Sequence, residues 1–395
     1  MLLTQCPVCA AALPARTAKQ CSRCKTRYCG PACQKKHWEE GGHDTLCKKI
    51  KRGGGAEQYH ADKKFTEAVT VAAEACAEDT KGQTCYICTR ALHWKTKEGL
   101  VRGCSCRGTA GFAHVSCLAE QAKISWEEAE ANNLDNDALN KGWIRWHTCG
   151  LCEQQYHGVV ACALGWACWK TYVGRPETNF TRRMAISQLG NGLSEAKHHE
   201  DALIVEEANL SMLQRVGASE HNILDARSDL ASTYWSLGQL EGSLGRLKDG
   251  LFLKRDVYSG RLRLNGEEHR STLRAAYNYA SSLQSLRGFE EAKALLRKIM
   301  PLAPRVLGES HELTLQMRGC YATALYKDPA ATEDDLREAV AMFEDADPIA
   351  RRVLGSSNPV ANAIESSLRD ARAALAARDV ESLREAVKAM TPGDA

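Results

Sequence analysis

The chain has 395 residues, of which 44% are hydrophobic and 26% charged, with a net charge of +3 and 18 cysteines. This length suffices for about two or three domains, and the composition excludes a fibrous or wholly disordered protein. The first residues lack the apolar core of a secretory signal, and no apolar run reaches the roughly 18 residues of a membrane span. We therefore expect a cytoplasmic or nuclear protein with no membrane partner, whose clustered cysteines bind metal rather than form disulfides.

The first group of metal ligands lies in residues 6–47, within an expected domain of residues 1–50. Its members form four local pairs, each with two or three intervening residues, so both side chains of a pair can reach one ion. Eight ligands fit two tetrahedral zinc ions, which must supply much of the folding energy of so short a segment. The candidates are Cys6, Cys9, Cys21, Cys24, Cys29, Cys33, His43 and Cys47.

The segment 28–38, together with the ligands that follow it, resembles the MYND zinc finger. The resemblance implies interleaved ligands: one zinc ion held by Cys6, Cys9, Cys29 and Cys33, the other by Cys21, Cys24, His43 and Cys47. It also implies a shallow groove that receives proline-containing peptides, lined in part by Gln34 and Trp38. Packing within a C-terminal helix is an equally good interpretation of Trp38. The motifs of methyltransferases that carry such fingers are missing downstream.

Residues 51–83 are expected to form a glycine-rich linker and an amphipathic helix. Three consecutive glycines, Gly53–Gly55, end any preceding helix, and apolar residues then recur at helical spacing over about 56–78. Cys76 lies on that apolar face and is expected to be a small core residue. Residues 1–52 carry a local charge of +8. Nucleic acid is nevertheless disfavoured as a partner, because no helix there clusters base-reading side chains and the basic residues offset zinc-bound thiolates.

The second group of ligands lies in residues 84–155, where a second zinc-stabilised domain is expected. Its pairs again supply eight protein ligands for two zinc ions, so the sites are structural and leave no open position for water or substrate. The candidates are Cys85, Cys88, Cys104, Cys106, His114, Cys117, Cys149 and Cys152.

The ligand order and the segment 104–118 resemble the RING-CH finger. The resemblance implies one zinc ion on Cys85, Cys88, His114 and Cys117, and another on Cys104, Cys106, Cys149 and Cys152. RING-CH proteins are often ubiquitin ligases, and Ile87 matches the family's apolar position for docking a ubiquitin-conjugating enzyme. The chain departs from the active pattern at Gln121, which replaces a docking tryptophan, and in a long gap after Cys117 that we expect a helix over 126–139 to fill.

The remainder of the chain is predicted to be helical. Residues 156–179 contain an expected buried connecting helix, 180–390 an all-α helical-repeat solenoid, and 391–395 a disordered end. The segments 278–283 and 288–292 resemble tetratricopeptide repeats, which implies a tetratricopeptide-type solenoid. Glycine followed by histidine or asparagine recurs at intervals of 42–48 residues, and a first helix is expected to end at Gly238 in one unit and at Gly288 in the next. The phrase Leu307–His311 resembles kinesin light chain repeats. The recurring histidines are expected to pack in loops rather than bind metal.

Two functions remain open, because no catalytic constellation is recognisable in the sequence. The first is an adaptor whose MYND groove and repeat groove recruit protein or peptide partners. The second is a RING-type ubiquitin ligase whose repeats select substrate. We place the adaptor ahead, because the docking positions around Ile87 depart from the active RING-CH pattern. The expected cofactor is four structural zinc ions.

Overall fold

The computed structural model describes residues 6–9, 11, 13, 18–132, 136–355 and 358–390. The end predicted to be disordered, residues 391–395, lies outside this part. The chain divides into two compact units, Met1–Ser243 and Leu244–Ala395. Within the described residues, no helix combines the length and the apolar character needed to cross a membrane.

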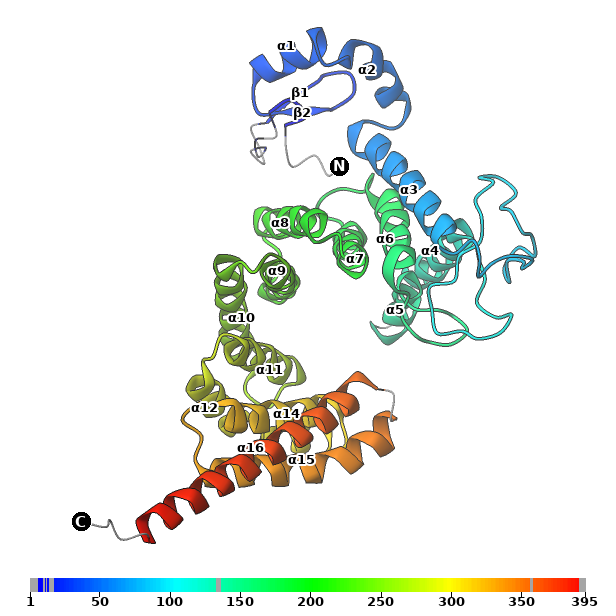
Figure 1. Ribbon diagram of the computed structural model, residues 1–395. Helices are drawn as coiled ribbons and strands as arrows, with labels where there is room; N and C mark the ends of the chain where they lie inside the picture. Colours follow the sequence, from blue (N-terminus) through cyan, green and yellow to red (C-terminus); the bar gives the residue numbers. More distant parts are fainter. Residues whose placement is uncertain are drawn as a thin grey trace. The chain divides into compact units, whose positions relative to one another are not determined.

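The first unit contains two small fingers and the first helices of the array (Figure 1). Its elements are β1 (Lys19–Gln20), β2 (Arg27–Tyr28), α1 (Pro31–Glu39), α2 (His43–Arg52), α3 (Ala56–Ala75), α4 (Val115–Ala131), α5 (Asn136–Trp143), the 3-10 helix η1 (Ile144–Trp146), α6 (Gly158–Tyr172), α7 (Phe180–Glu195), α8 (His199–Arg215) and α9 (Glu220–Glu241). We call residues 6–52 the first finger and residues 85–156 the second finger.

The first finger has a two-stranded antiparallel sheet followed by two short helices. Lys19 pairs with Tyr28 in the sheet, and proline at the start of α1 suits a position whose N–H has no helical partner. The helix predicted over 56–78 is α3, which begins after the glycine linker and ends at Ala75. Cys76 follows as its half-buried capping residue and packs against the core of the unit.

The helix predicted over 126–139 in the second finger is wrong in its bounds. The structure instead places α4 from Val115, directly after His114, to Ala131, and a separate α5 follows. The expected zinc ligand Cys117 therefore lies on the first turn of α4. The start of this helix was missed because its first residues were interpreted only as metal ligands and their spacers. Trp143 and Trp146 are buried, as expected of packing residues.

One hydrophobic core joins the second finger to the first helices of the array. It includes Phe65 on α3, Trp126 on α4, Leu164 on α6 and Leu189 on α7. The connecting helix α6 is apolar on nearly every side, packs against α3, α4 and α7, and buries both Cys162 and Cys168. The second finger and the helices α6–α8 thus form one folded body.

Helices α6 and α7 approach each other so closely that only glycine fits at two contact points. A Cβ atom added at Gly192 on α7 would lie 2.6 Å from the backbone oxygen of Ala161 on α6. One added at Gly165 on α6 would lie 3.1 Å from the backbone oxygen of Gln188 on α7. The two backbones are therefore in direct contact, which fixes how the finger meets the helical array.

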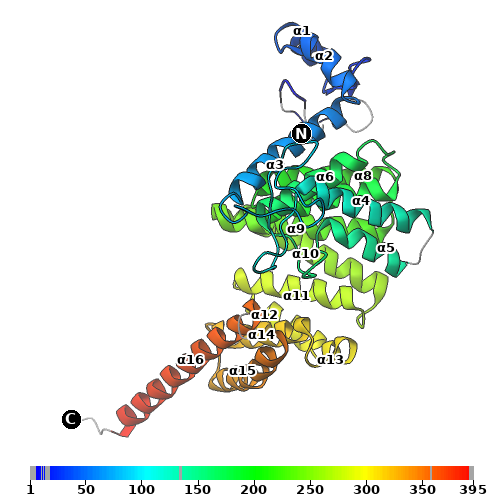
Figure 2. The ribbon, with the colours of Figure 1, turned by 90° about the vertical axis from the view of Figure 1, so that its right-hand side faces the viewer.

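The second unit consists of helices that pack with their neighbours along the chain (Figure 2). They are α10 (Leu244–Asn265), α11 (Arg270–Ser285), α12 (Phe289–Ile299), α13 (Leu302–Leu307), α14 (Glu312–Lys327), α15 (Glu333–Leu354) and α16 (Pro359–Met390). Alanine and leucine side chains of α11, α12, α14, α15 and α16 form its core. The all-helical character predicted for the region after residue 180 is thus seen in α7–α9 of the first unit and in every element of the second.

Two of the recurring histidines begin helices, whereas His221 lies in the first turn of α9, after its N-cap Ser219, so the expectation that these residues pack in loops is wrong. His269 and His311 occupy the N-cap positions of α11 and α14, where each Nδ1 accepts a hydrogen bond from the backbone N–H two residues later. Asn358 does the same before α16 through its Oδ1. These side chains satisfy N–H groups that have no partner inside the helix, which explains their regular spacing.

The predicted helix end at Gly238 is wrong. Helix α9 continues through Gly238, which is buried, and ends at Glu241. Gly242 then adopts a positive φ of 62°, the conformation that glycine tolerates best at a helix end. The prediction at Gly288 is confirmed, because this residue separates α11 from α12.

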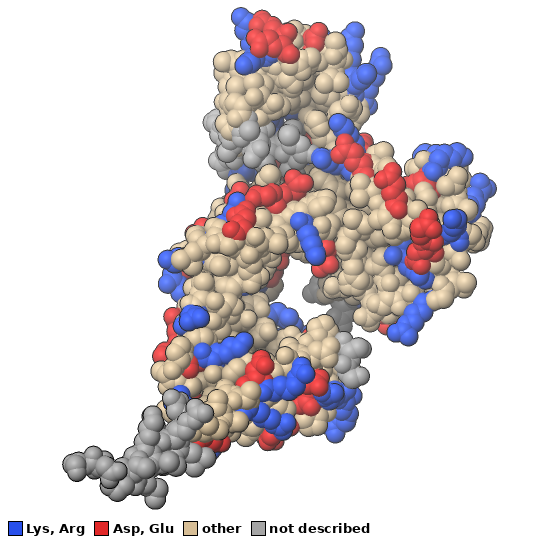
Figure 3. Space-filling view, viewed as in Figure 1, with Lys and Arg blue, Asp and Glu red and all other residues tan. Residues whose placement is uncertain are grey.

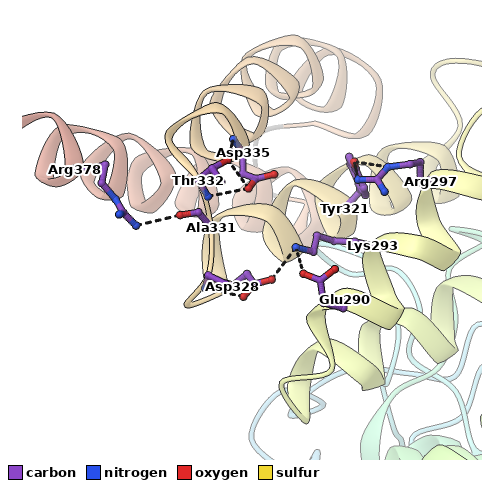
Figure 4. Close-up of polar contacts among 10 residues, drawn as sticks. Glu290, Lys293, Arg297, Tyr321, Asp328, Ala331, Thr332, Asp335 and Arg378 are labelled. Atoms are coloured by element: carbon purple, nitrogen blue, oxygen red, sulfur yellow. Dashed lines mark hydrogen bonds and ion pairs between the residues drawn. The ribbon is translucent and has the colours of Figure 1, made fainter. Parts of the chain in front are cut away.

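A buried ion pair connects α12 to the loop between α14 and α15 (Figure 4). Lys293 Nζ lies 2.7 Å from Asp328 Oδ2 and 2.6 Å from Glu290 Oε1, and both Lys293 and Asp328 are almost fully buried. The backbone N–H of Ala330 also donates to Asp328. The hydrogen bond from Lys293 holds the pKa of Asp328 below its ordinary value.

Replacing Lys293 with methionine is expected to destabilise the second unit by about 2–3 kcal/mol, because it leaves the Asp328 carboxylate buried without its cation. The lowered pKa of Asp328 also gives the pair a pH dependence. Its stabilisation is complete above the pKa of about 3.9 for unfolded aspartate, and it is lost as the pH falls through the lower folded value. Hydrogen exchange of α12 and α14 at pH 7 and pH 3 measures both effects, and Asp328→Asn should weaken the pH dependence.

Candidate metal centres and binding cavity

The cysteine pairs sit in tight turns that share one hydrogen-bonding pattern. In three of them, the N–H of the first cysteine donates to the carbonyl five residues later, and its carbonyl accepts from the N–H four residues later. These turns begin at Cys21, Cys85 and Cys149. The fourth residue after each of these cysteines has a positive φ. Such a turn points two sulfur atoms toward one place, as a shared metal ion requires.

In the first finger, the described residues form two groups whose ligand atoms lie within 4.8 Å of one another. Adjacent sulfur atoms of Cys9, Cys29 and Cys33 are 3.5–3.7 Å apart. A tetrahedron with zinc–sulfur bonds of about 2.3 Å has edges of about 3.8 Å, so this spacing fits zinc. The two groups are Cys6, Cys9, Cys29 and Cys33, and Cys21, Cys24, His43 and Cys47.

The second finger contains two further groups of the same kind. The sulfur atoms of Cys106 and Cys149 are 3.8 Å apart, although 42 residues separate them in the sequence. The ring of His114 offers Nδ1, which lies 3.4 Å from the sulfur of Cys88. The groups are Cys85, Cys88, His114 and Cys117, and Cys104, Cys106, Cys149 and Cys152. Four Cys/His clusters therefore fit four zinc ions, in the sets that the sequence resemblances imply.

The two histidine ligands are in the state that zinc binding requires. Burial lowers the pKa of His43 and of His114, which favours the neutral imidazole. His114 Nε2 lies 3.3 Å from the carbonyl oxygen of Ala91, and a bond there leaves Nδ1 as the metal-binding atom. His43 instead directs Nε2 toward Cys24, at 3.4 Å.

Each of the four groups supplies a complete tetrahedral set of protein ligands. A zinc ion held by four side chains has no free position for water or substrate, so its contribution is to folding. Sites of this kind are expected to stabilise the first finger most, because its own core is small, whereas the second finger shares the core of α6 and α7. Any activity of the fingers must therefore reside in the surface that the ions shape.

The residues predicted to bind partners, Gln34, Trp38 and Ile87, lie on elements that also carry zinc ligands. Gln34 is half-buried on α1, whereas Trp38, one turn later, is 45% exposed and packs edge-on against the ring of His43, with centroids 5.8 Å apart. Ile87 is exposed at the tip of the turn that begins at Cys85. Trp38 is therefore available for contact and is not part of the finger's core.

A second exposed apolar residue, Leu151, was missed by the sequence interpretation. It occupies the same place in the turn 149–152 that Ile87 occupies in the turn 85–88, which is a signal that the sequence contains. The two turns are bridged: Tyr86 hydroxyl donates to Gln121 Oε1 on α4 at 3.5 Å, and Gln121 borders Gly150. The residue that replaces the family's tryptophan thus connects the two turns.

A cavity of 760 Å³ lies where the end of the second finger meets helices α7, α8 and α9. Its lining is unusual in containing six carboxamide side chains, which come from the finger and from all three helices, together with aromatic rings such as Trp143, Tyr156 and Phe180. The carboxamides are those of Asn140, Gln155, Gln188, Asn191, Asn209 and Asn222. Each can both donate and accept hydrogen bonds.

Asn209 has an unsatisfied polar atom at this cavity. The residue is only 3% exposed, and its Nδ2 donates to Ser187 Oγ at 2.9 Å. Its Oδ1 is buried without a hydrogen-bond partner. A buried acceptor without a partner is costly to the folded state. Nothing in the sequence marks Asn209, because the cavity is assembled from segments up to 86 positions apart.

Comparison with known proteins supports the two finger assignments. Residues 6–47 match the family model described as the MYND finger, and residues 85–133 match the model described as the RING-variant domain. The sequence resemblances to these two fingers are confirmed. The second match stops before Cys149 and Cys152, which the structure nevertheless brings to Cys104 and Cys106. A comparison with curated proteins gave no match.

Among solved structures, the chain is similar to repeat proteins of the kinesin light chain kind. One is a candidate kinesin light chain of Podosopora anserina with nearly identical TPR-like repeats. It is 21% identical, covering 53% of this chain and 94% of that one, with a TM-score of 0.41. Another is BtubC (BKLC) from P. vanneervenii. It is 16% identical, covering 71% of this chain and 95% of that one, with a TM-score of 0.39.

Proposed function

We propose that the protein is a zinc-stabilised adaptor that binds peptide segments of other proteins at two places. The observation that carries this function is the 760 Å³ cavity with its six carboxamide side chains. An extended peptide presents alternating N–H and C=O groups, which side-chain amides can pair without reading the peptide's sequence. The exposed ring of Phe180 would cover its apolar side chains, beside the buried rings of Trp143 and Tyr156.

The second place is α1 of the first finger. Trp38 offers an exposed ring held against His43, and Gln34 lies one turn away on the same face of the helix. An aromatic ring beside a hydrogen-bonding amide suits a short proline-containing peptide, the ligand that the MYND resemblance implies. We expect such recruitment to take place in the cytoplasm or nucleus, because thiolate zinc ligands require a reducing compartment.

Variants of the cavity separate peptide binding from folding. Asn191 and Asn222 line the cavity without being buried, so replacing both with alanine should leave the fold intact. We expect peptides selected from a random display library on the full chain to lose about tenfold or more in affinity for this double variant, since each lost hydrogen bond costs about 1 kcal/mol. Asn362→Ala, an exposed amide on α16, is the matched control. Equal affinity in both variants would exclude the cavity.

The first finger is tested in the same way with proline-containing peptides. Trp38→Ala should abolish most of their binding, because the ring supplies the apolar contact, and it should leave binding in the cavity unchanged. Trp94→Ala is the control, because Trp94 is an exposed tryptophan of the other finger. If both tryptophan variants bind these peptides as the wild type does, α1 is not the site.

A ubiquitin ligase is the second candidate function, favoured by the match to the RING-variant domain and by the paired exposed residues Ile87 and Leu151. These side chains would dock a ubiquitin-conjugating enzyme, with Gln121 between them. The assay combines the full chain with activating enzyme, a panel of conjugating enzymes, ubiquitin and ATP. Ligase activity should be lost in Ile87→Ala and Leu151→Ala and kept in Ile144→Ala, which is also exposed. Absence of ubiquitin chains across the panel leaves the adaptor function alone.

A further inference from the structure

An exposed apolar pair projects from the second finger, outside both of its metal centres. Leu92 and Trp94 are 57% and 60% exposed, the highest values among the large apolar residues of this finger. They flank His93, which is only 9% exposed and packs edge-on against the ring of His114, with centroids 5.3 Å apart. Leu92 and Trp94 are thus two exposed apolar side chains on either side of a buried anchoring residue.

The loop is held rigidly, because its turn copies the hydrogen-bonding pattern of the cysteine turns. The N–H of His93 donates to the carbonyl of Glu98 at 3.0 Å, and the N–H of Lys97 donates to the carbonyl of His93 at 2.9 Å. Lys97 has the positive φ found at the same place in the metal-binding turns. His93 and Thr96 occupy the positions that the two cysteines of a metal-binding turn occupy. Instead of sharing an ion, their side chains contact each other, with His93 Nδ1 2.8 Å from the Thr96 hydroxyl oxygen. Trp94 is therefore exposed by a preorganised turn.

Cationic side chains surround the apolar pair. Arg90, Lys95 and Lys97 are all exposed, and in the described part of the chain none of them forms an ion pair. The nearby Glu98 is held by hydrogen bonds that its carboxylate accepts from the backbone and hydroxyl of Ser116 at the start of α4 and from the hydroxyl of Thr96 in the loop. Figure 3 shows Lys and Arg side chains along the outer edge of this finger.

We propose that this loop, residues 89–97, binds an anionic lipid surface, with Leu92 and Trp94 inserted at the headgroup level. A leucine and a tryptophan amid Lys and Arg match the composition of segments that lie in a membrane interface. The apolar pair projects outward on a narrow turn and is ringed by cations within three residues. A protein partner would instead need a broad apolar surface with a polar rim. This property is separate from peptide recruitment and does not depend on it. It departs from the expectation of no membrane partner, which rests on the lack of an apolar span and does not consider contact with a lipid surface.

Sedimentation with lipid vesicles tests the proposal on the full, zinc-loaded chain. The wild type should bind vesicles of phosphatidylcholine with phosphatidylserine and bind poorly to phosphatidylcholine alone. Lys95→Gln with Lys97→Gln should weaken binding to the anionic vesicles by about 25-fold, or about fivefold for each cation. Leu92→Ser with Trp94→Ser should weaken it by at least about tenfold. Brominated lipids should quench tryptophan fluorescence in the wild type more than in Trp94→Phe.

Two controls decide the interpretation. Trp38→Ala removes an exposed tryptophan from the other finger and should bind vesicles as the wild type does. Native mass spectrometry should find the same zinc content in every variant, which excludes loss of folding. Equal binding to neutral and anionic vesicles, or full binding by the Leu92/Trp94 variant, overturns the proposal. So does binding of polyglutamate, but not of vesicles, through the same residues, since the loop would then recognise an acidic protein.

Discussion

Removal of zinc is expected to unfold both fingers and to loosen helices α6–α8, while the second unit keeps its protection against hydrogen exchange. Structural zinc ions contribute about 10–16 kcal/mol to the folding of small fingers. The second finger shares its hydrophobic core with α6 and α7, so losing the metal-bound side of that core exposes Leu164 and Leu189. The core of the second unit is formed by other residues, which begin at Leu273.

Native mass spectrometry should count four zinc ions per chain before chelation. Hydrogen exchange should then rise over residues 18–52, 85–156 and α6–α8 after a chelator is added. Cys106→Ser should lose at least one ion, whereas Cys76→Ser should keep all four, because Cys76 lies outside every ligand group. Two ions in the wild type, or fingers that resist chelation, would contradict this prediction.

Replacing Gly192 with alanine is expected to destabilise the first unit by at least about 3 kcal/mol. The added Cβ would lie 2.6 Å from the backbone oxygen of Ala161, and neither helix can yield without moving its backbone. Gly165→Ala should cost less, since its nearest backbone contact is 3.1 Å. Denaturant unfolding of the full chain, with hydrogen exchange of α6 and α7, measures the effect.

Gly174→Ala is the matched control for that experiment. This glycine follows α6, and a Cβ built there meets no atom within 4 Å. The variant should therefore have the stability of the wild type. A Gly192→Ala chain as stable as the Gly174→Ala chain would mean that α6 and α7 are not in backbone contact.

The groups of zinc ligands could be predicted from the sequence because the two ligands of each pair lie close together along the chain. Ligand pairs such as Cys85 and Cys88 share one turn, and family resemblance then supplies the crossing between distant pairs. The pairing of Cys106 with Cys149 across 42 residues follows only from the resemblance or from the structure. Residues outside such pairs carry no comparable signal.

The parts that could not be predicted depend on contacts between distant segments. Gly192 is an ordinary helix residue in the sequence, and only the approach of α6 explains it. Gly238 and Gly242 both fit a helix end by composition, and burial of the first decided between them. Asn209 belongs to a cavity built from the finger and three helices, so no periodic pattern marks it. The turn at His93 has no cysteine to reveal its likeness to the metal-binding turns.

The core shared by the second finger and helices α6–α8 has a consequence for how such a protein can be divided and recombined. A cut after residue 155, where the ligand pattern ends, would separate Trp126 from Leu164 and leave both pieces with an open apolar face. A cut between Ser243 and Leu244 respects both compact units. Each piece of such a cut would keep its own core, so this boundary is the point at which we expect a different set of repeats to be joined to the metal-bound half.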